Sequence, residues 1–207
     1  MEFLEVVEGR RSIRYFTDEE IPEEDIRRIV AIGTLAPNAG NRQDWRCLVI
    51  KENSTKNKIK ELVQEKLESL AKRAGKENPE RYRNRHSSIL FARAPVVLVF
   101  LTTPYRSPID ELLKENGYSE AEIDCLRMRP DIQTISAMVQ NILLSSYMMG
   151  YGTCWMVAPN IARHEIENCL GIRPPWSIAA FVAMGRASQA PEGSKRKPLD
   201  DVIEFIR

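Results

Sequence analysis

The fold is decided by residues 131–149, DIQTISAMVQNILLSSYMM, a long apolar run closed by Gly150. Apolar residues recur in it at steps of three and four and also fall on the opposite face, which predicts a helix buried nearly all round. The run contains no Lys, Arg or Glu, and Gly150 suits a left-handed helix terminus. We therefore expect this helix at the centre of one domain or between two subunits, with most of its residues serving as ordinary core.

Other elements are predicted on both sides of this run. Helix-starting residues and apolar spacing predict helices over residues 2–8 (with Phe3, Leu4, Val6 and Val7 inward), about 22–36, 55–73 and 163–170. Apolar runs predict strands over residues 45–50, 96–101, 151–157 and 178–184, and alternation predicts a terminal strand over 200–206. Residues 104–130 read as an irregular or briefly helical excursion, suited to a lid or a substrate wall. Without a repeat or a clear linker, residues 1–207 are predicted to form a single domain.

Composition limits the kinds of partner that the chain can have. Of its 207 residues 43% are hydrophobic and 29% charged, and the net charge of +1 supplies no overall field for nucleic acid or an anionic membrane. The first residues are acidic where a signal peptide is basic, and no apolar run reaches the roughly 20 residues needed to cross a bilayer. A cytoplasmic protein is expected. The scattered cysteines and histidines predict neither a zinc site nor a disulfide framework.

A short basic segment runs from Arg10 to Arg14, with Arg11 and Ser12 inside it. In an extended chain Arg10, Ser12 and Arg14 point to the same side, so that one phosphate could meet all three. Gly9 would let the backbone bend close to such a ligand. Taken alone, the segment is better explained as a solvated basic turn, because short basic runs are common.

A loop dense in amides follows, PNAGNRQDW over residues 37–45. Asn and Gln offer paired donors and acceptors, which suit the edge of a planar heterocycle, although an ordinary polar loop has the same composition. Later in the chain, Gly152 would permit a flat group to approach the backbone of a strand closely. A second basic cluster, GSKRKPL, occupies residues 193–199.

Taken together and in this order, these stretches resemble the nitroreductase family of FMN-dependent oxidoreductases. The resemblance rests on RRSIRYF (residues 10–16), LAPNAGNRQDW (35–45), Gln140-Asn141, GYGTCW (150–155) and RKPL (196–199). Each motif is weak alone, but their joint order is specific. Asp44 stands where the family usually has Pro, Asn38 where it has Ser, and residues 157–159 depart from its commoner Gly-containing run.

The resemblance implies an α+β fold, with a mixed central sheet flanked by helices. It also implies an intertwined homodimer in which the long buried helices pack together and the C-terminal segments embrace the partner. FMN would be the cofactor, bound at the subunit interface, and NAD(P)H the electron donor. By the family's pattern, the phosphate and ribityl chain would be held by Arg10, Ser12 and Arg14, with Arg11 adjacent and Arg196 joining from the C-terminal cluster. The remaining flavin contacts would come from Pro37, Asn38, Ala39, Asn41 and Gln43 of the other subunit, from Trp155, Met156 and Val157 along the ring, and from Gly185 and Arg186 near the phosphate.

The implied activity is a ping-pong reaction, in which hydride from NAD(P)H reaches the flavin N5 and then a small acceptor such as a nitro compound, quinone or enone. The cofactor performs the difficult step, so no side chain need act as an acid or base. One alternative is a flavin-binding module, a store or sensor, without reductase turnover. Another is an RNA binder using Arg10–Arg14 and Arg81–His86, which is disfavoured because no aromatic residues are interleaved with those arginines. The physiological acceptor and the choice between NADH and NADPH stay open.

Overall fold

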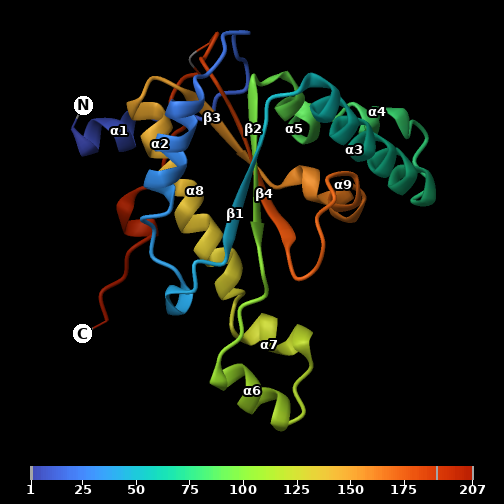
Figure 1. Cartoon of the computed structure of the whole chain (residues 1–207), viewed down its shortest axis with the longest axis vertical. Coiled ribbons are helices and arrows are strands. Elements are labelled where there is room, and N and C mark those ends of the chain that lie inside the picture. The colour runs from blue at the N-terminus through green and yellow to red at the C-terminus, as the bar shows by residue number, and fades with distance from the viewer. Residues whose placement is uncertain (1, 190, 207) are drawn as a thin grey trace.

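Four antiparallel strands form the central sheet of the computed structural model, which describes residues 2–189 and 191–206. They are β1 (Trp45–Ile50), β2 (Val96–Thr102), β3 (Gly152–Met156) and β4 (Ser177–Gly185), in the spatial order β1-β2-β4-β3 (Figure 1). All pairings among these strands are antiparallel, so the prediction of a mixed sheet is wrong for them, and only an isolated bridge between Ser12 and Thr153 is parallel. The expected α+β architecture is confirmed.

Strand β2 shows how the sheet organises the core. All of its residues are buried, as expected for a continuous apolar run covered on both faces. Because side chains alternate across a strand, Val96, Leu98 and Phe100 join one hydrophobic cluster, whereas Val97, Val99 and Leu101 join the other. The sheet therefore lies between two separate apolar layers.

Helices cover both faces of the sheet (Figure 1). One face carries α2 (Glu23–Gly33) and α8 (Pro130–Met148), and α1 (Phe3–Gly9) packs against α8. The other carries α3 (Asn53–Arg73), α5 (His86–Ile89) and α9 (Arg163–Cys169), with α4 (Glu80–Arg83) beside α3. Short 3-10 turns connect these elements: η1 (Ala39–Asn41), η2 (Leu90–Arg93), η3 (Ala158–Ala162) and η4 (Leu199–Asp201).

The long apolar run is the central helix, as predicted. Pro130 starts α8, and Gly150 follows its end in the left-handed region at φ 82°. Helix α2 crosses α8 closely, because a Cβ atom on Gly33 would stand only 2.7 Å from Ile142 Cγ1. Among the described residues, no helix has both the length and the apolar character that a membrane crossing needs.

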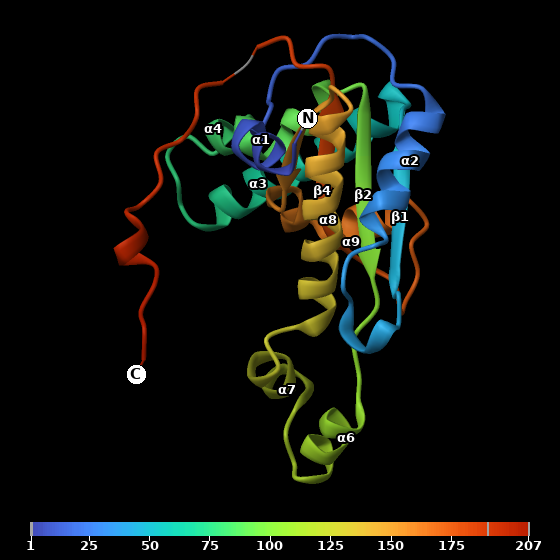
Figure 2. The same ribbon diagram turned by 90° about the vertical axis from the view of Figure 1, so that its left-hand side faces the viewer.

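Two terminal elements differ from the predictions. In α1 only Val6 is buried, whereas Phe3, Leu4 and Val7 are 69%, 68% and 43% exposed, so the inward placement of these three side chains is wrong for a single chain. Residues 200–206 are not a strand: a 3-10 turn and an exposed extended tail lie there, away from the body (Figure 2). A strand needs a neighbour to pair with, and the sheet of the same chain does not reach this tail.

Residues 104–130 form a projecting helical hairpin of α6 (Pro108–Glu115) and α7 (Glu120–Leu126) (Figures 1 and 2). Each helix begins with a capping box, from Ser107 to Asp110 in α6 and from Ser119 to Glu122 in α7. Arg106 links the two by ion pairs to residues of α7. The excursion is thus more regular than its sequence suggests, because local capping and charge pairing replace a core.

Candidate functional site

The segment from Arg10 to Arg14 lies extended along the first residues of β3. The Ile13 N–H donates to the Thr153 carbonyl oxygen at 2.8 Å, and the Ile13 side chain is buried. Gly152 makes this contact possible, because a Cβ there would stand 2.5 Å from Ile13 Cγ1. With Ile13 turned inward, its neighbours Ser12 and Arg14 are exposed on the outer side of the strand.

This outer side forms one wall of a pocket of about 620 Å³. The pocket joins the end of α1, the basic segment, the middle of α8 and residues 191–196, and it brings together four arginines and two glutamates. Five of the predicted site residues line it, namely Arg10, Arg11, Ser12, Arg14 and Arg196. Two basic segments far apart in the sequence therefore converge on one hollow, which we call the arginine pocket.

Arg11 differs in its role from the other arginines of this pocket. Its guanidinium turns back and donates to the carbonyl oxygens of Glu8 and Arg10, which caps the end of α1. It also packs against the backbone at Gly193, where a Cβ would stand 2.8 Å from Arg11 Nη2. Arg11 thus holds the walls of the pocket, while Arg10 and Arg14 have no ion-pair partner within 4.0 Å among the described residues.

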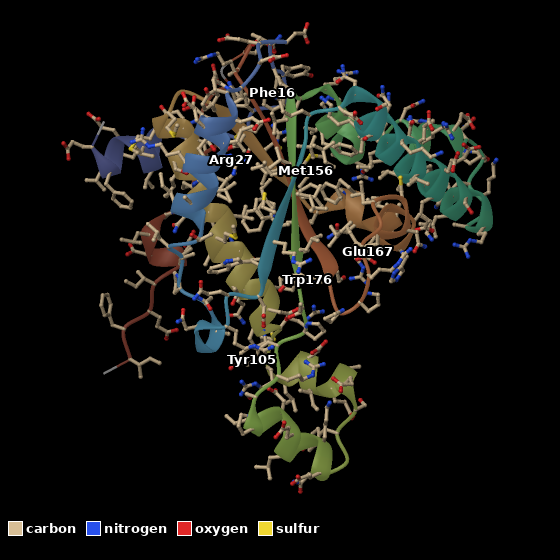
Figure 3. All side chains as sticks on the ribbon, in the orientation of Figure 1. Phe16, Arg27, Tyr105, Met156, Glu167 and Trp176 are labelled. Carbon is tan, nitrogen blue, oxygen red and sulfur yellow. The ribbon has the colours of Figure 1, made fainter. Side chains whose placement is uncertain are left out.

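The end of β3 continues the site beyond Arg14. Trp155 and Val157 are 36% and 60% exposed, whereas the Met156 side chain is buried in the core (Figure 3). Burial raises the pKa of the Cys154 thiol, and the nearby charge of Arg14 opposes that rise, which indicates that Arg14 stands close to β3. A planar ligand beside this strand could contact Trp155 and Val157 by their side chains and Met156 only through its backbone.

The amide loop lies elsewhere in the chain and is tightly held. Gly40, Asn41 and Gln43 have φ values of 60°, 51° and 53°, in the left-handed region that is unfavourable for the latter two. Asn38 Oδ1 accepts from the Gln43 N–H at 2.9 Å, and the Ala39 N–H donates to Thr134 Oγ1 of α8 at 3.1 Å. Within one chain the loop, including the exposed Pro37, does not line the arginine pocket.

Gly185 and Arg186 also lie outside the arginine pocket. Gly185 is buried, and a Cβ there would stand 2.7 Å from Pro95 Cδ. Arg186 pairs with Glu19 at 2.7 Å and lies over the Tyr151 ring, with its Cζ 5.2 Å from the ring centroid. Tyr151 in turn donates from its hydroxyl to Asp25 Oδ2 of α2. These groups join α2 to the sheet, so the structure gives Arg186 a role in packing.

The hydroxyl of Tyr151 allows a test of this joint, that is, of the contacts that connect α2 to the sheet. Burial, aided by the Asp25 carboxylate, raises the pKa of Tyr151 to about 12, so the folded protein prefers the protonated phenol. This stabilisation is present below the ordinary tyrosine pKa of about 10 and is lost as the pH rises toward 12. Tyr151→Phe should lower the free energy of unfolding at pH 7 by about 1–3 kcal/mol and flatten its alkaline decline. Urea unfolding across pH measures both, with exposed Tyr82→Phe as the control; equal stability of the two variants would contradict the joint.

Comparison with known proteins identifies the family of the chain. The model of the nitroreductase family matches residues 7–186. The chain belongs to the nitroreductase family. An Archaeoglobus fulgidus protein that bears the name NADH dehydrogenase/NAD(P)H nitroreductase is 28% identical over 186 residues, 89% of this chain and 84% of that protein. Among solved structures, a BluB-like flavoprotein of Clostridium difficile 630 superposes with a TM-score of 0.90 at 26% identity, over 100% of both chains. A nitroreductase with bound FMN from Desulfitobacterium hafniense DCB-2 has a TM-score of 0.71 at 21% identity, also over 100% of both chains, which shows the shared fold.

Some residues of the pocket in this nitroreductase-family chain were not predicted as site residues. Gln140 reaches the arginine pocket from α8, and residues 191–194 form part of its wall. Gln140 carries a usable signal, because the Gln140-Asn141 pair is one of the motifs on which the family resemblance rests. Residues 191–194 carry none, since an irregular strap is placed only by the contacts that it makes.

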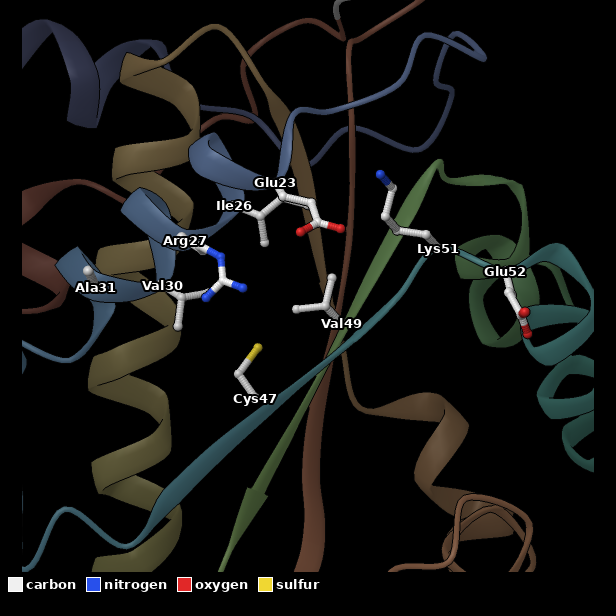
Figure 4. Close-up of a pocket in the computed structure, with 9 residues that line it drawn as sticks. All are labelled: Glu23, Ile26, Arg27, Val30, Ala31, Cys47, Val49, Lys51 and Glu52. Atoms are coloured by element: carbon white, nitrogen blue, oxygen red, sulfur yellow. The ribbon is translucent and has the colours of Figure 1, made fainter.

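A second and more apolar hollow of about 670 Å³ lies between α2 and the outer edge of β1 (Figure 4). Ile26, Val30 and Val49 line it, and the oppositely charged side chains of Glu23 and Arg27 also border it. Cys47 belongs to this lining, and burial raises the pKa of its thiol to about 12, so it is not a thiolate at neutral pH. The lining of this hollow therefore suits an apolar polypeptide segment better than the phosphate of a redox cofactor.

Proposed function

We propose that this oxidoreductase of the nitroreductase family binds FMN, takes hydride from NAD(P)H and reduces a small activated organic acceptor. The observation that carries the proposal is the convergence of Arg10, Arg14 and Arg196 on one pocket beside β3. A protein of net charge +1 has little reason to gather arginines unless they meet an anion. The bound FMN of the Desulfitobacterium hafniense protein and the name of the Archaeoglobus fulgidus relative support the same choice of cofactor and donor.

The side chains would divide the work of binding the cofactor. Arg10, Ser12 and Arg14 would hold its phosphate and ribityl chain, with Arg196 joining from the strap, because guanidinium groups bind phosphate through paired hydrogen bonds. Trp155 and Val157 would lie along the flavin ring. When bound, FMN supplies the redox step in a ping-pong sequence, accepting hydride from NAD(P)H and passing it to the acceptor. The protein binds and orients, and no acid or base side chain is assigned.

A homodimer would complete each cofactor site. The amide loop, with Pro37, Asn38, Ala39, Asn41 and Gln43, would reach the flavin of the other subunit, since in its own chain it lies apart from the arginine pocket. Exposed apolar side chains support pairing: Phe3, Leu4 and Leu35 are 69%, 68% and 79% exposed.

The C-terminal tail would bind the partner at the hollow beside β1. Val202, Phe205 and Ile206 of the tail are 66%, 74% and 95% exposed, although large apolar side chains favour burial. Strand β1 is at the end of the sheet order, and its outer edge and apolar hollow offer a place where an extended segment could add as a further strand. This exchange would give residues 200–206 the strand neighbour that they lack in a single chain.

The α6–α7 hairpin would form a wall of the acceptor site. Its base lies against the amide loop, because the Tyr105 hydroxyl is 3.4 Å from where a Cβ on Gly40 would stand. Because the base of the hairpin lies against the amide loop, the hairpin would lie beside the same partner flavin that the loop reaches. Nitro compounds, quinones and enones are the acceptor classes to compare.

Anaerobic spectroscopy tests the proposed function directly. The purified protein should be yellow or take up FMN, bleach near 450 nm when NADH or NADPH is added, and recover its colour with an acceptor. A colourless protein that does not take up FMN would refute flavin binding. A yellow protein whose colour survives both nicotinamides would refute the reductase and leave a flavin store or sensor.

A further inference from the structure

Arg42 connects the amide loop to the base of the α6–α7 hairpin. Its Nη1 donates to the Arg106 carbonyl oxygen at 3.0 Å, and its Cζ lies 5.5 Å from the centroid of the Tyr105 ring. Tyr105 is at the point where the chain leaves the sheet for the hairpin (Figure 3). One guanidinium therefore contacts two consecutive residues at the start of the excursion through a hydrogen bond and a cation–π contact.

Asp44 holds that guanidinium in place. Arg42 Nε lies 2.7 Å from Asp44 Oδ2, and this oxygen is buried without a well-aligned hydrogen bond from any described residue. A buried carboxylate oxygen is costly unless a positive charge compensates it, so Asp44 restricts Arg42 to one orientation. The backbone of Asp44 is also held in place, since Thr102 Oγ1 at the end of β2 donates to the backbone carbonyl oxygen of Asp44 at 3.2 Å.

The junction around this pair is nearly filled. The space between the amide loop, the end of β2, Tyr105 and the start of α8 measures only about 10 Å³. That is about the space of one water molecule, so the groups around it are closely packed, although the Arg42 and Asp44 side chains remain 41% and 31% exposed on the outer side. An isolated exposed ion pair contributes little, but this pair acts within a packed contact and has two further partners.

Most ion pairs of the hairpin among the described residues lie within the hairpin itself or at its returning end. The charged groups Arg106, Lys114 and Arg127 form ion pairs inside the hairpin itself. Arg129 pairs with Asp124 and with Asp131, the second residue of α8, at the returning end. The departing end is held by the contacts of Arg42 with Tyr105 and Arg106.

We infer that Asp44 is a positioning residue that, through Arg42, fastens the α6–α7 hairpin to the amide loop and so fixes the acceptor side of the site. The inference rests on the proposed function, in which the loop reaches the flavin and the hairpin borders the acceptor. The amide loop and the hairpin then move as one body. The clamp acts on the hairpin and so on acceptor binding. The flavin contacts of the amide loop are kept by other hydrogen bonds, from the Gln43 N–H to Asn38 Oδ1 and from the Ala39 N–H to Thr134 Oγ1, which the clamp does not share.

Asp44→Asn removes the charge while keeping the size of the side chain. The Michaelis constant for the acceptor should rise on the order of fivefold, because the loosened hairpin must be ordered at each encounter. The Kd for FMN and the rate of anaerobic bleaching should stay at the wild-type values. Arg42→Ala should have the same effect, and the double variant should be no worse than either single one, since both remove one clamp. Asp44→Glu, which retains the charge, should restore part of the affinity.

Hydrogen exchange provides a readout that needs no turnover. Amides of residues 104–130 should exchange faster in FMN-loaded Asp44→Asn than in the wild type, while those of β2 and α8 stay protected. Glu61→Gln, which breaks an exposed ion pair with Lys58 on α3, is the matched control and should change neither readout. Wild-type exchange in the hairpin of Asp44→Asn would overturn the clamp, as would an FMN Kd that rises as much as the acceptor constant. Failure of the proposed function would appear differently, as a wild-type protein that does not bind or reduce flavin.

Discussion

A chain that ends at Pro198 should be monomeric and should lose FMN. The removed segment carries the exposed apolar side chains of Val202, Phe205 and Ile206, whose proposed place is the hollow beside the partner's β1. Without it, the amide loop of the partner is no longer held near the arginine pocket, and the cofactor keeps only the contacts from one subunit. The FMN Kd should rise on the order of 100-fold, which corresponds to about 2.7 kcal/mol. Light scattering after gel filtration measures the mass, and flavin fluorescence measures the affinity.

Point variants separate the apolar contacts from a general effect of truncation. Phe205→Asp should reproduce much of the dissociation, because a carboxylate placed in an apolar contact loses its hydration. Glu204→Gln changes the charge of the same tail without removing an apolar side chain and should leave the dimer intact. A truncated monomer that retains all its flavin would show that one subunit suffices for the site. A truncated protein that stays dimeric would show that the tail is not the fastening.

Elements with a strong internal pattern could be predicted from the sequence almost to their ends. Strand β1 occupies the predicted residues 45–50, and the central helix begins one residue before the predicted run and ends one residue before its last. Both depend on local features, namely the period of apolar residues, Pro130 at the start of the helix and Gly150 after its end. The convergence of Arg10 and Arg196 in one pocket was anticipated only through the family resemblance, because no periodicity relates positions so far apart.

The remaining differences have a common physical cause. The apolar residues of α1 and of residues 200–206 are predicted to be buried. The sequence pattern does not say whether the same chain or a partner chain covers them. Arg11 and Arg186 are as basic as Arg14, yet one caps α1 and the other packs on Tyr151. The direction of a guanidinium depends on acceptors brought near by tertiary folding, and that information is absent from a local sequence pattern.

Arg14→Ala should weaken FMN binding more than any other single change in the basic segment. Arg14 lies where the arginine pocket meets β3, close enough to Cys154 to influence the pKa of its thiol, and has no ion-pair partner within 4.0 Å among the described residues. Its charge is therefore available to the ligand. A lost charge-assisted hydrogen bond costs about 1.5–3 kcal/mol, so the FMN Kd should rise roughly 10- to 150-fold. Titration of the apoprotein with FMN, followed by fluorescence quenching, measures this change.

Three further variants and one ligand analogue decide whether Arg14 acts as a phosphate ligand. Arg14→Lys should recover part of the affinity, because the charge returns without the paired geometry of a guanidinium. Riboflavin, which lacks the phosphate, should bind Arg14→Ala and the wild type alike. Arg42→Ala, in the amide loop, should leave the FMN Kd at the wild-type value, since its guanidinium is engaged by Asp44 and Arg106, and so should Arg73→Ala on α3. Equal FMN Kd values for Arg14→Ala and Arg42→Ala would refute the phosphate assignment, because a general effect of positive charge would then explain the loss of affinity.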